Sequence, residues 1–208
     1  MENPFTEEEI RAAVWDCGRE KSPGPDGFNI EFIKACWQVV KKDITEAIQE
    51  FSQRNHIPRG CNSAFISLIP KKLDASDLSD FRPISLVGII FKILSKTMAS
   101  RLKKILHYVI NPIQSAFVQD RQILDGPMII NETIDWARKK KKKVFMFKTD
   151  IAKAYDSVSW KYLDEVMKAM NFGDRWRRWI QACLKSSAMS VLVNGSPTQE
   201  FSMERGLR

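Results

Sequence analysis

The sequence is poor in the residues that hold structural zinc or cross-link secreted proteins. Its four cysteines are scattered singly and form no Cys-x-x-Cys pair, and its two histidines stand far apart. Zinc fingers and disulfide-rich scaffolds need such residues in close, repeated spacing. This scarcity argues against a zinc site and favours reduced thiols with a structural role.

Long apolar runs are also missing. No stretch approaches the length that a membrane span requires, and the N-terminus opens with Glu2 and Glu7–Glu9 where a signal peptide would be basic and then apolar. We therefore expect an intracellular protein, in the cytoplasm or the nucleus, with no membrane partner.

Acidic residues are fewer than basic ones. The 208 residues include 33 Lys and Arg against 25 Asp and Glu, for a net charge of +8. This balance favours a polyanion partner such as nucleic acid, although it is also compatible with a merely soluble basic protein. A hydrophobic content of 44% is enough for a buried core, in one large domain or two small ones.

The most informative stretch runs from 144 to 167. The apolar run Val144–Phe147 predicts a short buried strand that places Asp150 at its end. Side chains alternate along a strand, so Phe145 and Phe147 would share a packed face while Lys148 and Asp150 share the other. Apolar residues at helical spacing from 158 onward predict a helix that follows a turn.

Other patterns predict the remaining elements. Thr6 and Glu9 form a capping box that opens a helix ending near Gly18. Periodic apolar residues predict helices over 30–53, 88–110, 123–137 and from 174, with Trp176 and Trp179 in the core. Strands are expected over 64–69 and 81–86, and a hairpin over 190–203 turns at Asn194-Gly195.

The wording Asp-Ile-Ala-Lys-Ala-Tyr-Asp, residues 150–156, resembles motif A of reverse transcriptases from non-LTR (LINE-type) retrotransposons. The resemblance implies that Asp150 and the backbone carbonyl of Ile151 bind Mg²⁺ or Mn²⁺ in the complete enzyme, and that Tyr155 blocks a ribose 2′-OH. Oxygen ligands suit Mg²⁺, and two such ions can clamp the attacking and leaving oxygens of a phosphoryl transfer.

Two further segments fit the same family. The loop Ser-Pro-Gly-Pro-Asp-Gly-Phe, residues 22–28, resembles the start of its fingers, although by composition alone it is an ordinary interhelix loop. The strand, basic pair and Phe-Arg-Pro-Ile-Ser-Leu segment over 64–86 resembles its fingers hairpin. The resemblance puts Lys71 or Lys72 and Arg82 on the phosphates of the incoming dNTP, whereas charge alone is equally typical of a solvated hairpin tip.

Candidate contacts to the RNA template and DNA primer lie between these segments. The pattern Q-x-A-F-x-x-x-R-x-x-x-D resembles a family segment and assigns this role to Gln114, Phe117 and Arg121. On the polar side of helix 88–110, Lys92 and Lys96 either follow a nucleic-acid backbone or are simply solvated.

A basic run over 138–143 precedes the motif A stretch. It has several interpretations: cations that complement a helix C-terminus, a solvated loop, a nuclear-import patch, or a direct nucleic-acid contact whose binding falls with salt. The arginines and tryptophans of 174–180 could likewise stack on bases, but their spacing favours core packing.

The sequence lacks one element that the resemblance requires. Glu204–Arg208 resembles the opening of motif B and places Gly206 beside the nucleotide, yet no Asp-Asp pair for motif C occurs anywhere in the sequence. Motif C is expected beyond Arg208, and the remaining palm and the thumb would be the natural intramolecular partners. We therefore expect this chain to be catalytically incomplete on its own.

Together these patterns predict an α+β fold with the fingers and partial palm of a right-hand polymerase. Residues 1–142 would form the fingers and the fingers–palm helices, and 143–208 the first part of an antiparallel palm sheet backed by helices, truncated before the catalytic Asp-Asp hairpin. The predicted function is that of a reverse transcriptase fragment. The alternatives are a noncatalytic nucleic-acid-binding module and an unselected transposon remnant.

Overall fold

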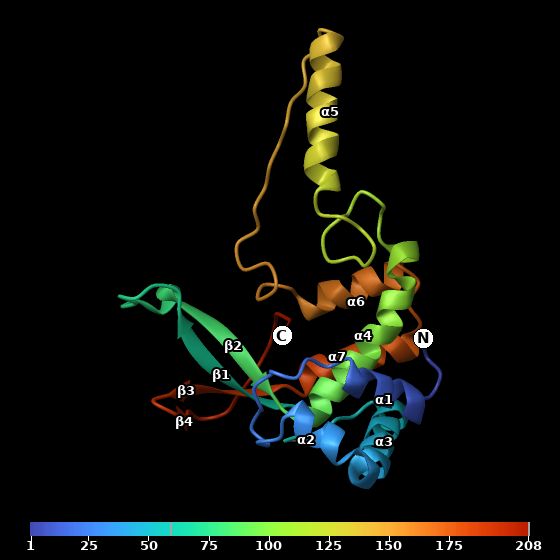
Figure 1. Ribbon diagram of the computed structural model, residues 1–208, viewed down its shortest axis with the longest axis vertical. Helices are drawn as coiled ribbons and strands as arrows, with labels where there is room; N and C mark the ends of the chain where they lie inside the picture. Colours follow the sequence, from blue (N-terminus) through green and yellow to red (C-terminus); the bar gives the residue numbers. More distant parts are fainter. Residues whose placement is uncertain (59, 208) are drawn as a thin grey trace. The chain divides into compact units, whose positions relative to one another are not determined.

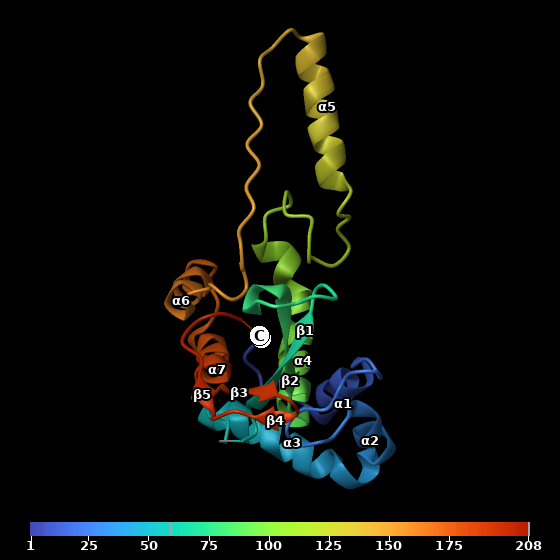
Figure 2. The same ribbon diagram turned by 90° about the vertical axis from the view of Figure 1, so that its left-hand side faces the viewer.

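The computed structural model describes residues 1–58 and 60–207, and the chain divides into two compact units. Unit 1 combines residues 1–98 with 155–208, and unit 2 is the segment Ala99–Ala154. These units are defined by how compactly their residues pack and not by their function. The predicted boundary between fingers and palm, at residues 142 and 143, therefore stays a prediction. Figures 1 and 2 show the chain from two directions at right angles.

The N-terminal part of unit 1 is a group of three helices, α1 (Glu7–Trp15), α2 (Ile30–Ala35) and α3 (Trp37–Arg54). Both views show them side by side in blue and teal (Figures 1 and 2). The capping box is confirmed, because the Glu9 N–H donates to the Thr6 hydroxyl at 3.3 Å and the Thr6 N–H donates to the Glu9 carboxylate at 3.2 Å. The helix predicted from Thr6 to Gly18 thus begins as expected and ends at its C-cap, Asp16.

The single helix predicted over 30–53 is wrong in one respect. The structure divides it at Cys36, whose backbone angles, φ −96° and ψ 13°, lie outside the helical range and serve as the C-cap of α2 and the N-cap of α3. Ile33 and Trp37, on either side of the break, are both buried. Since neither glycine nor proline occurs there, the local sequence carries no signal for the break.

Helix α7 (Asp174–Lys185) supplies the centre of the core. Trp176 and Trp179 are 1% and 0% exposed, which confirms the predicted core position. The Trp179 ring lies 5.0 Å from that of Phe5 and 6.2 Å from that of Phe51, measured between centroids, and its indole N–H donates to the Ser52 carbonyl at 3.1 Å. The N-terminal segment, α3 and α7 therefore share one aromatic cluster.

The sheet of unit 1 is mixed, which corrects part of the predicted antiparallel arrangement. Its strands are β1 (Ser63–Pro70), β2 (Phe81–Val87), β3 (Ala188–Val193), β4 (Ser196–Pro197) and β5 (Phe201–Ser202). Their order is β2-β1-β3-β4, with β5 also paired to β3. The β1–β3 pair is parallel. A parallel pair needs a long crossover, and about 120 residues separate these two strands in the chain.

Both predicted hairpins are present. Strands β1 and β2 pair antiparallel from Ala64 opposite Val87 to Pro70 opposite Phe81. At the β3–β4 turn, Asn194 and Gly195 have φ of 51° and 80°, the left-handed pair that a type I′ turn requires. The predicted return strand, 198–203, is shorter than expected and is reduced to β5.

The other helices match the predicted periodicity. α4 (Ile89–Val109) begins in unit 1, where Ile93, Leu94 and Met98 are buried, and continues into unit 2. α5 (Asp125–Lys139) belongs to unit 2, and α6 (Trp160–Ala169) belongs to unit 1. No helix of the described chain has the length and apolarity needed to cross a bilayer.

The strand predicted over 144–147 is wrong. Residues 142–151 have no regular secondary structure, and the face expected to be packed is exposed, with Phe145 at 87% and Phe147 at 78%. A strand is stable only when a neighbouring strand satisfies its backbone groups, and no described strand pairs with this segment. The apolar pattern was therefore present without the pairing that turns it into a strand.

Candidate active site and nucleic-acid contacts

The three candidate phosphate-binding cations lie where the β1–β2 hairpin turns, in unit 1. Lys71 follows β1 and donates from Nζ to the Ser79 carbonyl at 2.7 Å. Lys72 forms an ion pair with Asp80 at 2.9 Å. Arg82 stands opposite Ile69 in the hairpin and is exposed, and its guanidinium contacts no partner among the described residues. The structure thus brings the three side chains to one end of the hairpin. Of the three, only the Arg82 guanidinium has no such partner among the described residues.

Asp80 organises this hairpin end. Its carboxylate accepts from the backbone N–H groups of Ser76 and Asp77, both at 3.2 Å, as well as from Lys72. The Lys72 hydrogen bond, followed by these backbone donors, holds the pKa of Asp80 below its ordinary value. Asp80 therefore stays ionised at neutral pH and offsets part of the charge of Lys72.

A second cluster joins the turn after motif A to the opening of motif B, both in unit 1. The Leu207 N–H donates to the Tyr155 carbonyl at 2.8 Å, and the Gly206 N–H donates to the Val158 carbonyl at 2.9 Å. The Trp160 indole N–H completes the cluster by donating to the Gly206 carbonyl at 2.8 Å. Two residues assigned to the nucleotide, Tyr155 and Gly206, therefore come together although about 50 residues separate them.

Gly206 is required at this junction for steric reasons. Its φ is +87°, and a Cβ atom placed there would lie 2.8 Å from the Asp156 carbonyl oxygen. Side chains rarely adopt this φ, and the neighbour is backbone that cannot rotate away. The close approach of the two segments thus depends on glycine.

Asp150 and Ile151 belong to unit 2 and lie in the exposed segment described above. No group of three or more His, Cys, Asp or Glu residues in the described part of the chain is arranged to hold a metal ion. Mg²⁺ requires near-octahedral oxygen coordination, to which this segment offers one carboxylate and one backbone carbonyl. These donors alone do not fit a two-metal site.

Arg121 is engaged within unit 2. Its guanidinium donates to three backbone carbonyls, those of Ile110 at 3.0 Å, Asn111 at 2.7 Å and Gln114 at 2.6 Å. The Gln114 side chain donates to the Ala116 carbonyl at 3.1 Å. Arg121 therefore shapes the loop that follows α4.

The remaining candidate in this segment, Phe117, is 87% exposed and has a left-handed φ of 62°. A bulky residue seldom adopts that conformation, so the loop holds the ring outward at a cost in backbone strain. An exposed aromatic ring can stack on a nucleic-acid base. The position is consistent with the template or primer contact assigned to Phe117, which stays a prediction.

Lys92 and Lys96 both have intramolecular partners. Lys92 donates to the Ser22 carbonyl at 2.6 Å, and partial burial lowers the pKa of its ammonium group. Lys96 forms an ion pair with Asp16 at 2.6 Å. Both contacts tie the start of α4 to the segment that follows α1, so the assignment of these lysines to nucleic acid stays a prediction.

The sequence pattern did not predict that Gly24 and Asp26 contact the start of α4. The Asp26 carboxylate accepts from the first backbone N–H of α4, at Ile89, and from the Phe28 N–H at 3.2 Å. A Cβ atom at Gly24 would lie 2.3 Å from the carbonyl carbon of Val87. The 22–28 loop is thus a cap on α4, and the clue was an Asp in a Gly-Pro-rich turn, which is typical of a side chain that bonds backbone N–H groups.

The similarity to known proteins extends over the segments described above. Residues 69–208 match the family model described as reverse transcriptase (RNA-dependent DNA polymerase). The uncharacterized 149 kDa protein of transposon TX1 from Xenopus laevis is 32% identical over 208 residues, which cover 100% of this chain and 16% of that protein.

Two Pol polyproteins of R2 elements are also similar. The retrovirus-related Pol polyprotein from type-1 retrotransposable element R2 of Popillia japonica is 24% identical and covers 99% of this chain, and that from type-2 element R2DM of Drosophila melanogaster is 24% identical and covers 98%. The chain spans 28% and 19% of these two relatives. It belongs to the reverse transcriptase family, and its relatives are the Pol proteins of non-LTR retrotransposons.

Proposed function

We propose that this chain contributes the fingers and the first part of the palm to an RNA-directed DNA polymerase, and that it does not polymerise by itself. In the complete reaction, a primer 3′-OH attacks the α-phosphate of a dNTP while an RNA strand serves as template. Such catalysis depends on positioning and on neutralising charge. The residues of this chain would supply part of both.

The observation that carries the proposal is the contact between Tyr155 and the Gly206–Leu207 segment. The family resemblance assigns both segments to the nucleotide, and they are joined by backbone hydrogen bonds of 2.8 and 2.9 Å in the same unit. The bonds fix the backbone of Tyr155, a residue that is 59% exposed. An aromatic ring on a fixed backbone can exclude a ribose 2′-OH by steric contact.

The hairpin cations would hold the triphosphate. Arg82 presents a planar fork of donors that can grip phosphate oxygens bidentately, and its guanidinium has no competing partner among the described residues. Lys71 and Lys72 would add positive charge beside it after exchanging their bonds to Ser79 and Asp80 for phosphate.

Catalytic incompleteness follows from the donors that the chain contains. Asp150 is one carboxylate, and the sequence contains no Asp-Asp pair to complete the set. When bound, Mg²⁺ or Mn²⁺ would stabilise the charge that develops on the transferring phosphoryl group. With most coordination positions left to water, we expect tight two-metal binding to fail in this chain alone.

The test is primer extension on an RNA template with Mg²⁺ or Mn²⁺, using the purified chain beside Asp150→Ala. We expect both proteins to bind the primer–template in a salt-dependent gel shift and neither to extend it. Extension that disappears in Asp150→Ala would show that the chain is catalytically complete after all. Failure of both proteins to bind would contradict a nucleic-acid function for this chain.

A further inference from the structure

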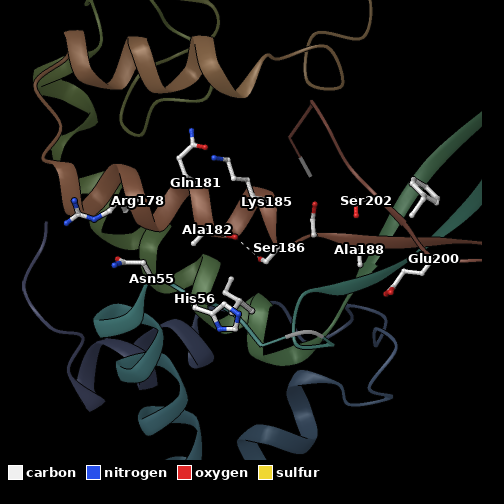
Figure 3. A pocket seen from close by; sticks show the side chains of 13 residues that line it. Asn55, His56, Arg178, Gln181, Ala182, Lys185, Ser186, Ala188, Glu200 and Ser202 are labelled. Atoms are coloured by element: carbon white, nitrogen blue, oxygen red, sulfur yellow. Dashed lines mark hydrogen bonds between the residues drawn. The ribbon is translucent and has the colours of Figure 1, made fainter.

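A cleft of about 780 Å³ lies within unit 1, and none of the residues assigned to polymerisation lines it. It is bounded by the end of α3, by one face of α7 and by strands β3 and β5 (Figure 3). Side chains of Asn55, His56, Arg178, Gln181 and Lys185 line it together with several serines. Its volume is in the range of small-molecule and nucleotide sites.

The cations of α7 divide into two sets. Arg175 donates to the Ser52 carbonyl at 3.0 Å and lies 5.3 Å from the centre of the Trp179 ring. Arg177 is paired with Asp164. Arg178 and Lys185 are exposed at the cleft. The charge of Lys185 also acts on Asp164, whose pKa is lowered mainly by its hydrogen bond with Arg177. Helix α7 therefore uses two cations for its own packing and presents the other two at the cleft.

The two cleft cations, Arg178 and Lys185, lie in one row. They are seven residues apart, which on an α-helix is two turns, or a rise of about 10 Å on the same face. Figure 3 shows Arg178 at one end of the row, Lys185 at the other, and Gln181 between them. Two charges at this separation suit a polymer with repeated phosphates better than a single anion.

A neutral polar group in the cleft wall lacks a partner. The Oδ1 atom of Asn55 is buried and accepts no hydrogen bond from the described residues. Asn55 is held by its left-handed φ of 52° at the C-cap of α3. Because this atom has almost no exposed surface, Asn55 bounds the cleft without offering that oxygen to a ligand.

One acidic residue sets the orientation of a ligand. Glu200 lines the cleft beside β5, and its carboxylate accepts from the Ser63 hydroxyl at 3.0 Å. Its charge would repel phosphate from the β5 side. A phosphate backbone would therefore follow α7.

We propose that this α7 cleft binds a single-stranded nucleic acid through its backbone, using residues other than those assigned to polymerisation. The ligand chemistry is a short polynucleotide, either RNA or DNA. The inference does not rest on the proposed function, because none of its residues takes part in that proposal.

The test compares the double variant Arg178→Gln/Lys185→Gln with a control that loses the same charge elsewhere, Arg19→Gln/Lys42→Gln. The control residues are 79% and 80% exposed, and their ion pairs are surface contacts. Fluorescence anisotropy would follow labelled oligouridylate and oligothymidylate of about 12 nucleotides, a typical single-strand site size, over about 50 to 200 mM salt. Thermal unfolding of each variant would show that the fold is intact.

We expect the cleft variant to bind about tenfold more weakly than the control. Two lost phosphate contacts should also reduce the slope of log K against log salt by about 1.4. Equal binding and equal slope in the two variants would overturn the proposal. Comparing oligouridylate with oligothymidylate distinguishes RNA from DNA as the ligand. A preference for oligouridylate would mean that the 2′-OH is recognised.

Two measurements locate the site. Bound oligonucleotide should protect Lys185 from chemical acetylation while Lys42 stays reactive, and unprotected Lys185 would contradict the assignment. Displacement by polyglutamate as effective as that by oligonucleotide would instead identify an acidic-peptide site. Primer extension and binding at the cleft are separate readouts, so this proposal and the polymerase proposal can fail independently.

Discussion

At the scale of single residues, Gly206 and Asp26 each hold distant segments together. Gly206 lets the motif B opening reach the turn after motif A, and Asp26 caps the first turn of α4. Both act on backbone groups, which have few alternative partners once buried. Each effect is therefore expected to appear as a change in stability.

We predict that Gly206→Ala lowers the free energy of unfolding by about 1–3 kcal/mol, because the new Cβ meets the Asp156 carbonyl and φ is +87°. Urea denaturation would measure the difference. The matched control is Gly18→Ala, where the added Cβ would meet only the end of Lys21 at 3.8 Å. Equal stability of the two variants would refute the steric argument.

Asp26→Ala should destabilise the protein by about 1–2 kcal/mol, because the Ile89 N–H at the start of α4 loses its acceptor. Asp43→Ala on the exposed surface of α3 removes the same carboxylate without such a contact and should change stability little. Thermal denaturation of both variants checks the difference. If Asp43→Ala proved as harmful as Asp26→Ala, loss of the cap would not be the cause.

At the scale of elements, α6 and α7 are joined by a bidentate ion pair. The Arg177 guanidinium donates to both oxygens of Asp164, at 2.9 and 3.0 Å. This hydrogen bonding holds the pKa of Asp164 below its ordinary value of 3.8. The pair is partly shielded, with side chains 18% and 32% exposed.

The shift has a definite consequence for pH. A carboxylate with a lowered pKa in the folded state contributes stability that is fully present above its unfolded pKa and is lost as pH falls through the lower, folded pKa. We expect Asp164→Asn to be less stable than the parent near neutral pH and to approach it below about pH 3. Glu165→Gln, beside it on α6, serves as the control, because its ion pair with Lys161 is exposed and measures 4.0 Å. Urea titrations between about pH 3 and 7 measure this, and a constant deficit of Asp164→Asn at all pH values would contradict it.

At the scale of the whole molecule, the exposed segment over 144–151 is the part that we expect to govern self-association. It presents Val144, Phe145, Met146, Phe147 and Ile151, each at least 50% exposed, on a backbone that no described strand pairs with. An unpaired apolar segment of this kind promotes contact with other chains. Self-association should therefore depend on this segment.

We predict that Phe145→Ser/Phe147→Ser reduces self-association without lowering the thermal midpoint. The control, Leu73→Ser/Leu78→Ser, removes two apolar side chains that are 103% and 82% exposed and lie in the hairpin loop. Analytical ultracentrifugation over a concentration series would compare them. A parent chain that stays monomeric throughout would refute the expected aggregation, and an equal effect of both pairs would show that the segment has no special role.

Sequence alone determined what depends on local chemistry. Helix starts such as the Thr6 capping box, the Asn194-Gly195 turn and the buried faces of α4 and α7 all arise from residues within a few positions of one another. The family motifs likewise named Asp150, Arg82 and Gly206 by their order in the chain. These signals survive in the sequence because the interactions that they encode are short in range.

Only the tertiary structure decided the rest. The break at Cys36, the parallel pairing of β1 with β3 and the contact of Gly206 with the Tyr155 turn each depend on residues far apart in the chain. The segment 144–147 shows the opposite case. Its local apolar pattern predicts a strand, but no strand forms because no neighbouring strand pairs with it. Backbone pairing and core packing both require groups from other segments of the chain. A local pattern can therefore indicate that a segment is suited to a strand, but it does not determine whether a partner segment is present.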